Sequence, residues 1–196
     1  MQPELKDLVI EVIDTCNARC VMCNIWKNEE EHRAPDVAIE QLPATLTNVN
    51  ISGGEPFLRA DLPQLVARLK KRCPRARIII SSNGFLPDRI ESQMSAILKV
   101  DPAVGVGISI DGRDGMHDRI RGIPGGFGKC METVRRLKRL GVRSLRLAFT
   151  ATEANVAMMT EVHRLAMEVG AEFTCAVAHN SGIYFRTSEN CALPAA

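Results

Sequence analysis

The stretch LVIEVIDTCNARCVMC, residues 8–23, joins a short run rich in β-branched residues to a loop that carries three cysteines. The apolar run has the length and composition of a buried β-strand. A stretch with helical periodicity follows further along the chain, so residues 8–23 begin a strand–loop–helix unit. Repetition of this unit through the rest of the sequence predicts an α/β fold.

Five further apolar runs follow, separated by turns rich in Gly, Ser, Asn or Asp and by amphipathic stretches. Strands that alternate with helices in this order pair in parallel, because a parallel neighbour needs a crossover connection. The six predicted strands are Leu8–Ile13, Val49–Ser52, Ile78–Ser82, Val106–Ile110, Leu145–Thr150 and Phe173–Ala178. The predicted helices are Asp36–Leu46, Asp61–Arg72, Pro87–Leu98, Phe127–Leu140 and Asn155–Val169.

The size of the chain limits the architecture. It has 196 residues, of which 45% are hydrophobic and 24% charged, so it can form one hydrophobic core. A closed eight-stranded (β/α) barrel usually takes about 250 residues. The remaining choices are an open doubly wound sheet and a curved sheet that forms part of a barrel. In both, ligands bind at the carboxyl ends of the strands.

Charge and hydropathy disfavour several classes of function. The 25 Lys and Arg residues against 23 Asp and Glu residues leave a net charge of +2, which does not indicate a nucleic-acid partner. The longest apolar runs, such as Leu8–Ile13, are far shorter than the ~20 residues that span a bilayer. The first residues, MQPELKD, do not resemble a signal peptide. We therefore expect a cytoplasmic protein without a membrane span.

Cys16, Cys20 and Cys23 form the pattern C-x3-C-x2-C. Seven cysteines without an export signal favour free thiols or metal ligands over a disulfide framework. Structural zinc normally needs a fourth protein ligand, and the sequence has no second C-x2-C pair. Three thiolates on a [4Fe–4S] cluster leave one iron open for a catalytic ligand. The spacing thus favours an iron–sulfur cluster, with zinc and an accidental group of loop cysteines as the alternatives.

Small polar motifs follow the next three predicted strands. These motifs are SGGEP (Ser52–Pro56), SSNG (Ser81–Gly84) and SIDG (Ser109–Gly112), and the last is followed by HDRIRG (His117–Gly122). Because parallel strands end at the same edge of a sheet, these turns are expected to lie beside the three thiols. One mouth of the fold would then hold nearly all of the unusual chemistry.

Together these residues resemble the radical S-adenosylmethionine (radical SAM) enzyme family. The resemblance extends from about Leu8 to Ala178. It rests on the three cysteines, on Gly53-Gly54-Glu55-Pro56, on Asn83-Gly84 and on Ser109-Ile110-Asp111-Gly112. It implies a partial (β/α)6 TIM-like barrel of parallel strands, forming one core domain over residues 1–196. It also implies a [4Fe–4S] cluster bound by the three cysteines, with S-adenosylmethionine at the open iron.

The resemblance implies an enzyme. In this family an electron from the cluster cleaves S-adenosylmethionine to methionine and a 5′-deoxyadenosyl radical, which abstracts hydrogen from a substrate. The electron is expected to come from a small protein of the flavodoxin or ferredoxin type, and the substrate is not identified by the sequence. The alternative is a non-catalytic module that uses the same cysteines to bind zinc or to sense redox state through an iron–sulfur cluster.

The family also implies how the two ends of the methionine moiety are bound. The backbone of Gly53 and Gly54 and the carboxylate of Glu55 are expected to meet its ammonium group. A glycine pair allows close backbone approach, and a carboxylate accepts hydrogen bonds. Ser109 and Arg121 are expected to bind its carboxylate, since arginine can bind a carboxylate with two parallel hydrogen bonds.

The remaining assignments concern the nucleoside. Asn83, Asp111 and Ser82 are candidates for the ribose hydroxyls by family position. Met22 replaces the aromatic residue that many members carry before the third cysteine, and it is expected to contact the adenine. Arg119 competes with Arg121 for the carboxylate.

Substrate determinants in such enzymes usually lie outside the barrel. His179 and Asn180 end the sixth predicted strand and are expected to face the same mouth, while Trp26 could assist Met22. Few residues follow the sixth strand, and Cys191 alone cannot bind a further cluster. We therefore expect a core domain that lacks a C-terminal substrate-binding extension.

Overall fold

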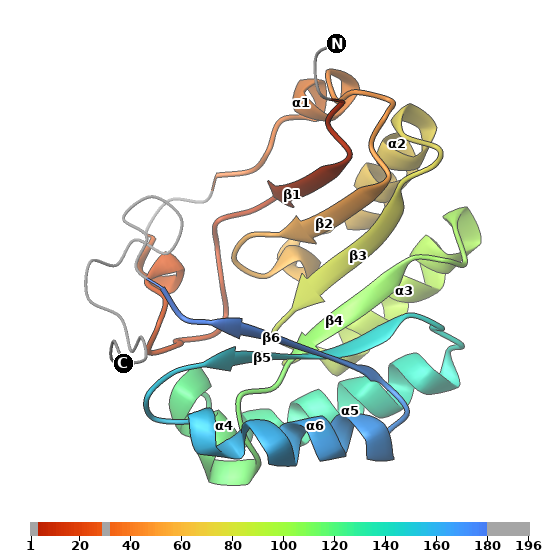
Figure 1. The fold of residues 1–196 in the computed structure, drawn as a ribbon. Coiled ribbons are helices and arrows are strands. Elements are labelled where there is room, and N and C mark those ends of the chain that lie inside the picture. Colours follow the sequence, from red (N-terminus) through yellow and green to blue (C-terminus); the bar gives the residue numbers. More distant parts are fainter. Residues whose placement is uncertain (1–3, 29–31, 180–196) are drawn as a thin grey trace.

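The computed structural model describes residues 4–28 and 32–179, which form a parallel six-stranded sheet in the order β1-β2-β3-β4-β5-β6 (Figure 1). The strands are Asp7–Glu11 (β1), Asn48–Ser52 (β2), Arg77–Ser82 (β3), Gly105–Ser109 (β4), Leu145–Ala151 (β5) and Glu172–Val177 (β6). A doubly wound sheet would reverse its order at a switch point, and this sheet does not. The predicted partial barrel is confirmed.

The helices lie on the outer side of the curled sheet (Figure 1). They are α1 (Asp36–Glu40), α2 (Leu62–Arg72), α3 (Pro87–Val100), α4 (Asp114–Arg121), α5 (Gly126–Arg139) and α6 (Met159–Glu168), with short 3-10 turns at Ile25–Lys27, Pro56–Leu58 and Val156–Met158. No helix of the described residues has the length and apolar character needed to cross a bilayer.

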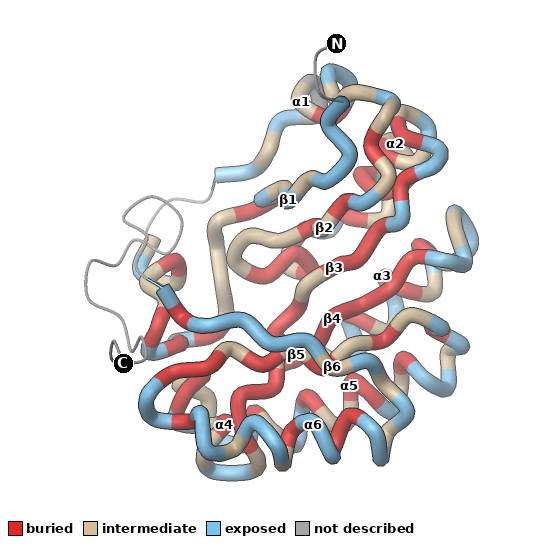
Figure 2. Tube along the Cα trace, in the orientation of Figure 1, coloured by how far each residue is buried: buried red, intermediate tan, exposed pale blue. Residues whose placement is uncertain are grey.

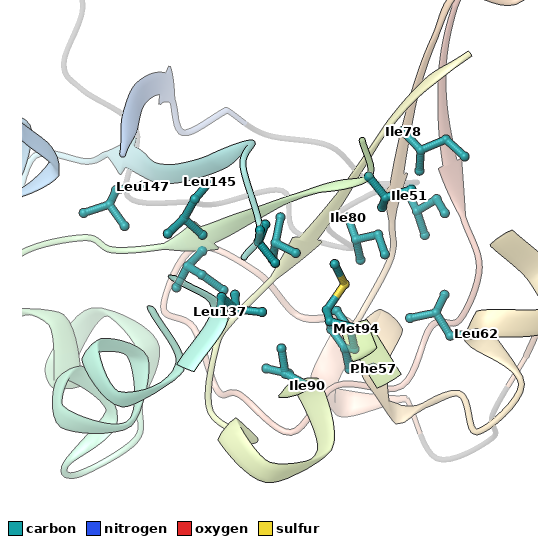
Figure 3. Close-up of a cluster of buried hydrophobic side chains, with 14 of the residues drawn as sticks. Ile51, Phe57, Leu62, Ile78, Ile80, Ile90, Met94, Leu137, Leu145 and Leu147 are labelled. Carbon is teal, nitrogen blue, oxygen red and sulfur yellow. The ribbon is translucent and has the colours of Figure 1, made fainter. Parts of the chain in front are cut away.

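The hydrophobic core fills the space between the sheet and the outer helices. On β2 the buried residues Val49 and Ile51 alternate with Asn48 and Asn50, as expected for a strand with one face on a core. Burial is nearly continuous in the central strands β3 and β4 and decreases toward β1 and β6 (Figure 2). The core residues drawn in Figure 3 include Ile51, Phe57, Leu62, Ile78, Ile80, Ile90, Met94, Leu137, Leu145 and Leu147. This packing fixes the sheet and therefore the position of its carboxyl edge.

Some predicted boundaries were wrong. The first helix was predicted at Asp36–Leu46, but α1 ends at Glu40 because Pro43 cannot continue it. The helix predicted at Asn155–Val169 starts as a 3-10 turn and becomes α-helical at Met159. Helix α4 was not predicted, although its last residues reach the functional site.

Candidate active site

A cavity of about 250 Å³ lies at the carboxyl edge of the sheet, where the sequence motifs were expected to meet. It brings together three thiols from the loop after β1 and turns from the ends of β2, β3 and β4. The predicted site residues that line it are Cys16, Cys20, Cys23, Met22, Gly53, Gly54, Ser82, Asn83, Ser109, Arg121 and His179. Glu55, Asp111, Trp26 and Arg119 are not part of this lining, and Asn180 lies outside the described residues.

The cysteine loop is fixed by backbone hydrogen bonds from two sides. On one side, Gly54 N–H donates to Ile13 O at 2.7 Å and Glu55 N–H donates to Thr15 O at 2.9 Å. These two bonds join the loop after β2 to the residues just before Cys16. The thiols are thus held at the edge of the sheet by its neighbouring strand.

On the other side, the loop contacts the last turn of α4. Arg19 N–H donates to Arg121 O, and Val21 N–H donates to Ile120 O, both at 2.9 Å. The last carbonyl groups of a helix have no partner inside the helix, so the loop provides the donors that they need. The two bonds flank Cys20 and set its position.

The glycine pair after β2 is required by the closeness of this contact. Gly53 has φ +121°, and a Cβ atom there would lie 2.2 Å from Ile13 O. A Cβ atom on Gly54 would lie 2.0 Å from Thr15 O. Both obstacles are backbone atoms that cannot rotate away, so only glycine fits at these two positions.

Glu55 lies behind the cavity and not in it. Its side chain is fully buried, and its carboxylate accepts hydrogen bonds from Asn83 N–H at 2.7 Å, from Phe57 N–H at 3.1 Å and from the Ser82 hydroxyl at 3.0 Å. Burial raises the pKa of Glu55 to about 7, against the opposing effect of these donors. In the structure the carboxylate joins the loops after β2 and β3, while its contact with an ammonium group stays a prediction.

Asn83 connects the loop after β3 to the cysteine loop. Its amide nitrogen Nδ2 donates to Asn17 Oδ1 at 2.7 Å and lies 3.8 Å from Cys16 Sγ. Its amide oxygen Oδ1 accepts from Phe85 N–H at 3.0 Å. The side chain is 6% exposed, so it borders the cavity while most of its polar groups are already bonded.

Asp111 and Arg121 form a buried ion pair. Arg121 Nε lies 2.5 Å from Asp111 Oδ2, and Asp111 Oδ1 accepts a hydrogen bond from Thr150 N–H at 2.7 Å. Asp111 is fully buried, so the structure places it behind Arg121 and away from the cavity, where ribose contact was expected. Arg121 borders the cavity, whereas Arg119 is exposed and contacts Met116 Sδ. Position therefore favours Arg121 as the cation of the site.

The three thiols are suited to a metal that displaces their protons. Burial raises the pKa of Cys16 to about 12 and also raises the pKa values of Cys20 and Cys23. Without a metal these residues are therefore neutral thiols at pH 7, and metal binding would release protons.

The donor set fits a cluster with one open iron. All three cysteines are free of disulfides and line one cavity. Within residues 4–28 and 32–179, no three His, Cys, Asp or Glu side chains are arranged to hold one metal ion. Three thiols in one cavity are the donors that a [4Fe–4S] cluster with one open iron would use.

Two residues that support the site were not found from the sequence. His117 of α4 is fully buried, its Nδ1 atom accepts from Asp111 N–H at 3.2 Å, and burial lowers its pKa to about 3. Asn155, considered above only as the start of a helix, donates from Nδ2 to Asp111 O and Thr150 O, both at 3.0 Å. His117 is the first residue of the HDRIRG motif and could have been noticed there. The direction of its side chain depends on helix α4, which was not predicted.

The remaining candidates near the cysteine loop separate into two groups. Met22 is 7% exposed and borders the cavity, as does His179. The Trp26 ring instead stacks near two cations, with Lys27 Nζ 5.3 Å and the Arg19 guanidinium carbon 6.0 Å from the ring centre. Met22 is therefore the better placed of the two for contact with a bound nucleoside.

The fold and the site define a class of protein: a partial (β/α) barrel with a three-thiol centre at the carboxyl edge of its sheet. The chain belongs to the Radical SAM superfamily, whose family model matches residues 10–165. Members of this family bind a [4Fe–4S] cluster and S-adenosylmethionine and need an electron donor. The predicted family and its cofactors are confirmed.

Relatives of known function are enzymes that use this domain in longer chains. Fe-coproporphyrin III synthase of Methanosarcina barkeri is 33% identical over 148 residues, covering 72% of this chain and 36% of that protein. Mycofactocin maturase MftC of Mycolicibacterium smegmatis is 29% identical over 171 residues, covering 84% of this chain and 42% of that protein. The chain thus spans less than half the length of these relatives.

Solved structures agree on the fold. Streptococcus suis SuiB bound to S-adenosylmethionine has a TM-score of 0.75 and 17% identity, covering 94% of this chain and 43% of SuiB. The protein anSMEcpe with bound S-adenosylmethionine has a TM-score of 0.73 and 19% identity, covering 97% of this chain and 56% of that protein. At these identities the likeness shows the partial barrel alone.

Proposed function

We propose that this chain is the core domain of an enzyme that cleaves S-adenosylmethionine reductively and starts a radical reaction on a substrate. The observation that carries the proposal is the position of Cys16, Cys20 and Cys23 in one cavity with the glycine pair and Arg121. When bound, the cluster supplies one electron to the sulfonium, which gives methionine and a 5′-deoxyadenosyl radical that takes a hydrogen atom from the substrate. The protein binds and orients the reactants and excludes water.

The residues of the cavity are proposed to bind two parts of S-adenosylmethionine, its methionine moiety and its nucleoside. Gly53 and Gly54 allow the backbone to approach the ammonium group, and Ser109 with Arg121 meets the carboxylate. Asn83 and Met22 border the same cavity and are proposed to contact the ribose and the adenine. These roles are supported by position.

Glu55 and Asp111 are proposed to act through their neighbours. Glu55 joins the Ser82 hydroxyl and the Asn83 backbone to the loop after β2. Asp111 orients Arg121 by their ion pair. In this view both carboxylates position groups that touch the cofactor.

The substrate is proposed to bind along the concave face of the sheet. A second cavity of about 510 Å³ lies there, and Ser81 lines both cavities. Its lining includes Asn50 and Thr174 as well as Arg77 and Arg146, so a polar molecule fits it better than an apolar one. Further substrate contacts are proposed to come from segments outside this chain, since the relatives are more than twice as long.

The electron donor is proposed to be a small protein of the flavodoxin or ferredoxin type. Such a donor would reduce the cluster by one electron for each molecule of S-adenosylmethionine cleaved. The described cysteines form no disulfides, which fits a reducing compartment such as the cytoplasm.

Anaerobic reconstitution tests the proposed function directly. The wild-type chain is expected to bind about four irons and, when reduced with dithionite in the presence of S-adenosylmethionine, to release 5′-deoxyadenosine. Cys16→Ala, Cys20→Ala and Cys23→Ala should each prevent assembly of the cluster, while Cys175→Ala, on the exposed face of β6, should not. A loaded cluster without nucleoside release would overturn the catalytic proposal, and zinc at one equivalent without visible absorption would favour the metal-binding module.

A further inference from the structure

The three cysteines have different electrostatic surroundings. Arg121 Nη1 donates toward Cys20 Sγ at 3.7 Å, and the Arg121 side chain is almost fully buried. The contacts to Cys16 Sγ come from neutral donors, the Ala18 N–H at 3.5 Å and the Asn83 amide at 3.8 Å. The sulfur of Cys20 thus has a charged guanidinium as a hydrogen-bond donor, whereas the donors to the sulfur of Cys16 are neutral.

The guanidinium is held in this position by several contacts. Asp111 Oδ2 lies 2.5 Å from Arg121 Nε, and Asp111 is itself bonded through Oδ1 to Thr150 N–H and through its backbone N–H to His117 Nδ1. The carbonyl of Arg121 accepts from Arg19 N–H, which lies next to Cys20 in the chain. Because both the backbone and the side chain of Arg121 are fixed, the guanidinium cannot turn away from the sulfur without breaking the ion pair.

Such a pair acts on a cluster by charge and by hydrogen bonding. Reduction adds one negative charge to a cluster, and much of this charge is shared by the sulfur ligands. Hydrogen bonds and positive charge at these sulfurs stabilise the reduced form and raise the reduction potential, whereas nearby negative charge lowers it. A buried site has a low effective dielectric constant, which strengthens both effects.

We propose that Asp111 and Arg121 together set the reduction potential of the cluster through the sulfur of Cys20, with Arg121 raising it and Asp111 limiting that rise. This inference rests on the cluster of the proposed function. It adds a role that does not require S-adenosylmethionine, because the contact to Cys20 exists in the structure of the chain alone. The reaction concerned is the addition of one electron from an external reductant, and no bond is formed or broken.

The two residues therefore have opposite expected effects. Arg121→Gln removes the positive charge and should shift the midpoint potential of the cluster to a lower value. Asp111→Asn keeps the shape of the side chain, leaves the guanidinium without its counter-charge, and should shift the potential to a higher value. The double variant Asp111→Asn/Arg121→Gln removes both charges and should lie between the single variants.

The measurement is a potentiometric titration of the reconstituted protein, monitored by electron paramagnetic resonance without S-adenosylmethionine. Arg119→Gln is the matched control, because Arg119 lies on the same helix but is exposed, and its potential should equal that of the wild type. Iron content is measured in every sample.

Opposite shifts in the two single variants support the proposal. Equal potentials in the wild type and both variants, or shifts in the same direction, overturn it. If Arg121→Gln does not retain iron, the sign of the shift in Asp111→Asn decides, since a downward or absent shift contradicts the proposal. Failure of nucleoside release in the wild type, with these shifts present, would instead contradict the proposed function alone.

Discussion

Replacing Gly54 by alanine should separate the loop after β2 from the cysteine loop. The new Cβ atom would lie 2.0 Å from Thr15 O, while real Cβ contacts below 3.0 Å essentially do not occur. The two backbone segments must therefore move apart by about 1 Å, which takes the bond from Glu55 N–H to Thr15 O, now 2.9 Å, beyond hydrogen-bonding distance. The neighbouring bond from Gly54 N–H to Ile13 O is strained by the same movement.

The size of the effect follows from these two bonds. A lost backbone hydrogen bond between partly buried groups costs about 1–2 kcal/mol and a strained one costs less, so the free energy of unfolding should fall by about 1–3 kcal/mol. The three thiols should also lose their alignment, because Cys16 directly follows Thr15. We expect Gly54→Ala to bind clearly less iron than the wild type on anaerobic reconstitution.

Gly107→Ala is the matched control. Gly107 lies on β4, and a Cβ atom there would meet nothing within 4 Å, so stability and iron binding should stay close to wild type. Urea unfolding of the metal-free proteins, followed by circular dichroism, gives the first quantity, and iron per chain gives the second. If Gly54→Ala matches Gly107→Ala in both measurements, the close contact between the two loops is not what requires glycine.

Three further perturbations test other parts of the structure. Burial raises the pKa of Glu55 from 4.5 to about 7, so the folded state holds this proton more tightly, and the resulting stabilisation, complete below pH 4.5, is lost as the pH rises toward 7. In urea unfolding of the metal-free proteins, the wild type should therefore lose about 3 kcal/mol of stability relative to Glu55→Gln between pH 4.5 and pH 7. Parallel pH profiles of the two proteins would contradict this pKa. Gly128→Ala, in α5 with no atom within 4 Å of the new Cβ, should raise the free energy of unfolding by about 0.5–1 kcal/mol, and an unchanged or lower value would count against an unstrained helical position. Ile80→Ala removes a fully buried side chain from β3 and should cost about 2–5 kcal/mol, whereas a loss below 1 kcal/mol would mean that the core collapses around the cavity.

The six strands could be predicted because each is a short, largely apolar run that ends in a turn. Helix α4 could not, because Met116 and Ile120 are the only large apolar residues of Asp114–Arg121. Its position is set by contacts outside the helix, which are the ion pair of Arg121 with Asp111 and, far away in sequence, the bonds to the cysteine loop. A segment that is helical because of its partners leaves little periodicity to read.

The candidate site shows a similar division. The order of strands and turns in the sequence correctly predicts that the cysteines, the glycine pair, Asn83 and Ser109 lie at the carboxyl edge of the sheet, because parallel strands end together. It could not tell whether a side chain beyond the strand end faces the cavity. Ser109 is the last residue of β4 and lines the cavity, but Asp111 lies two residues beyond the end of the strand, is fully buried and does not line it.

The contact between the end of α4 and the cysteine loop joins two segments that the ribosome synthesises at different times. Arg121 and Cys20 are 101 positions apart, so a ribosome must complete most of the barrel before the loop gains its second anchor. A nascent chain that has exposed only its first cysteines offers three flexible thiols, and these are held at fixed spacing only after Arg121 has been synthesised and packed. The fixed arrangement of thiols that a cluster needs therefore forms only after this part of the barrel has folded.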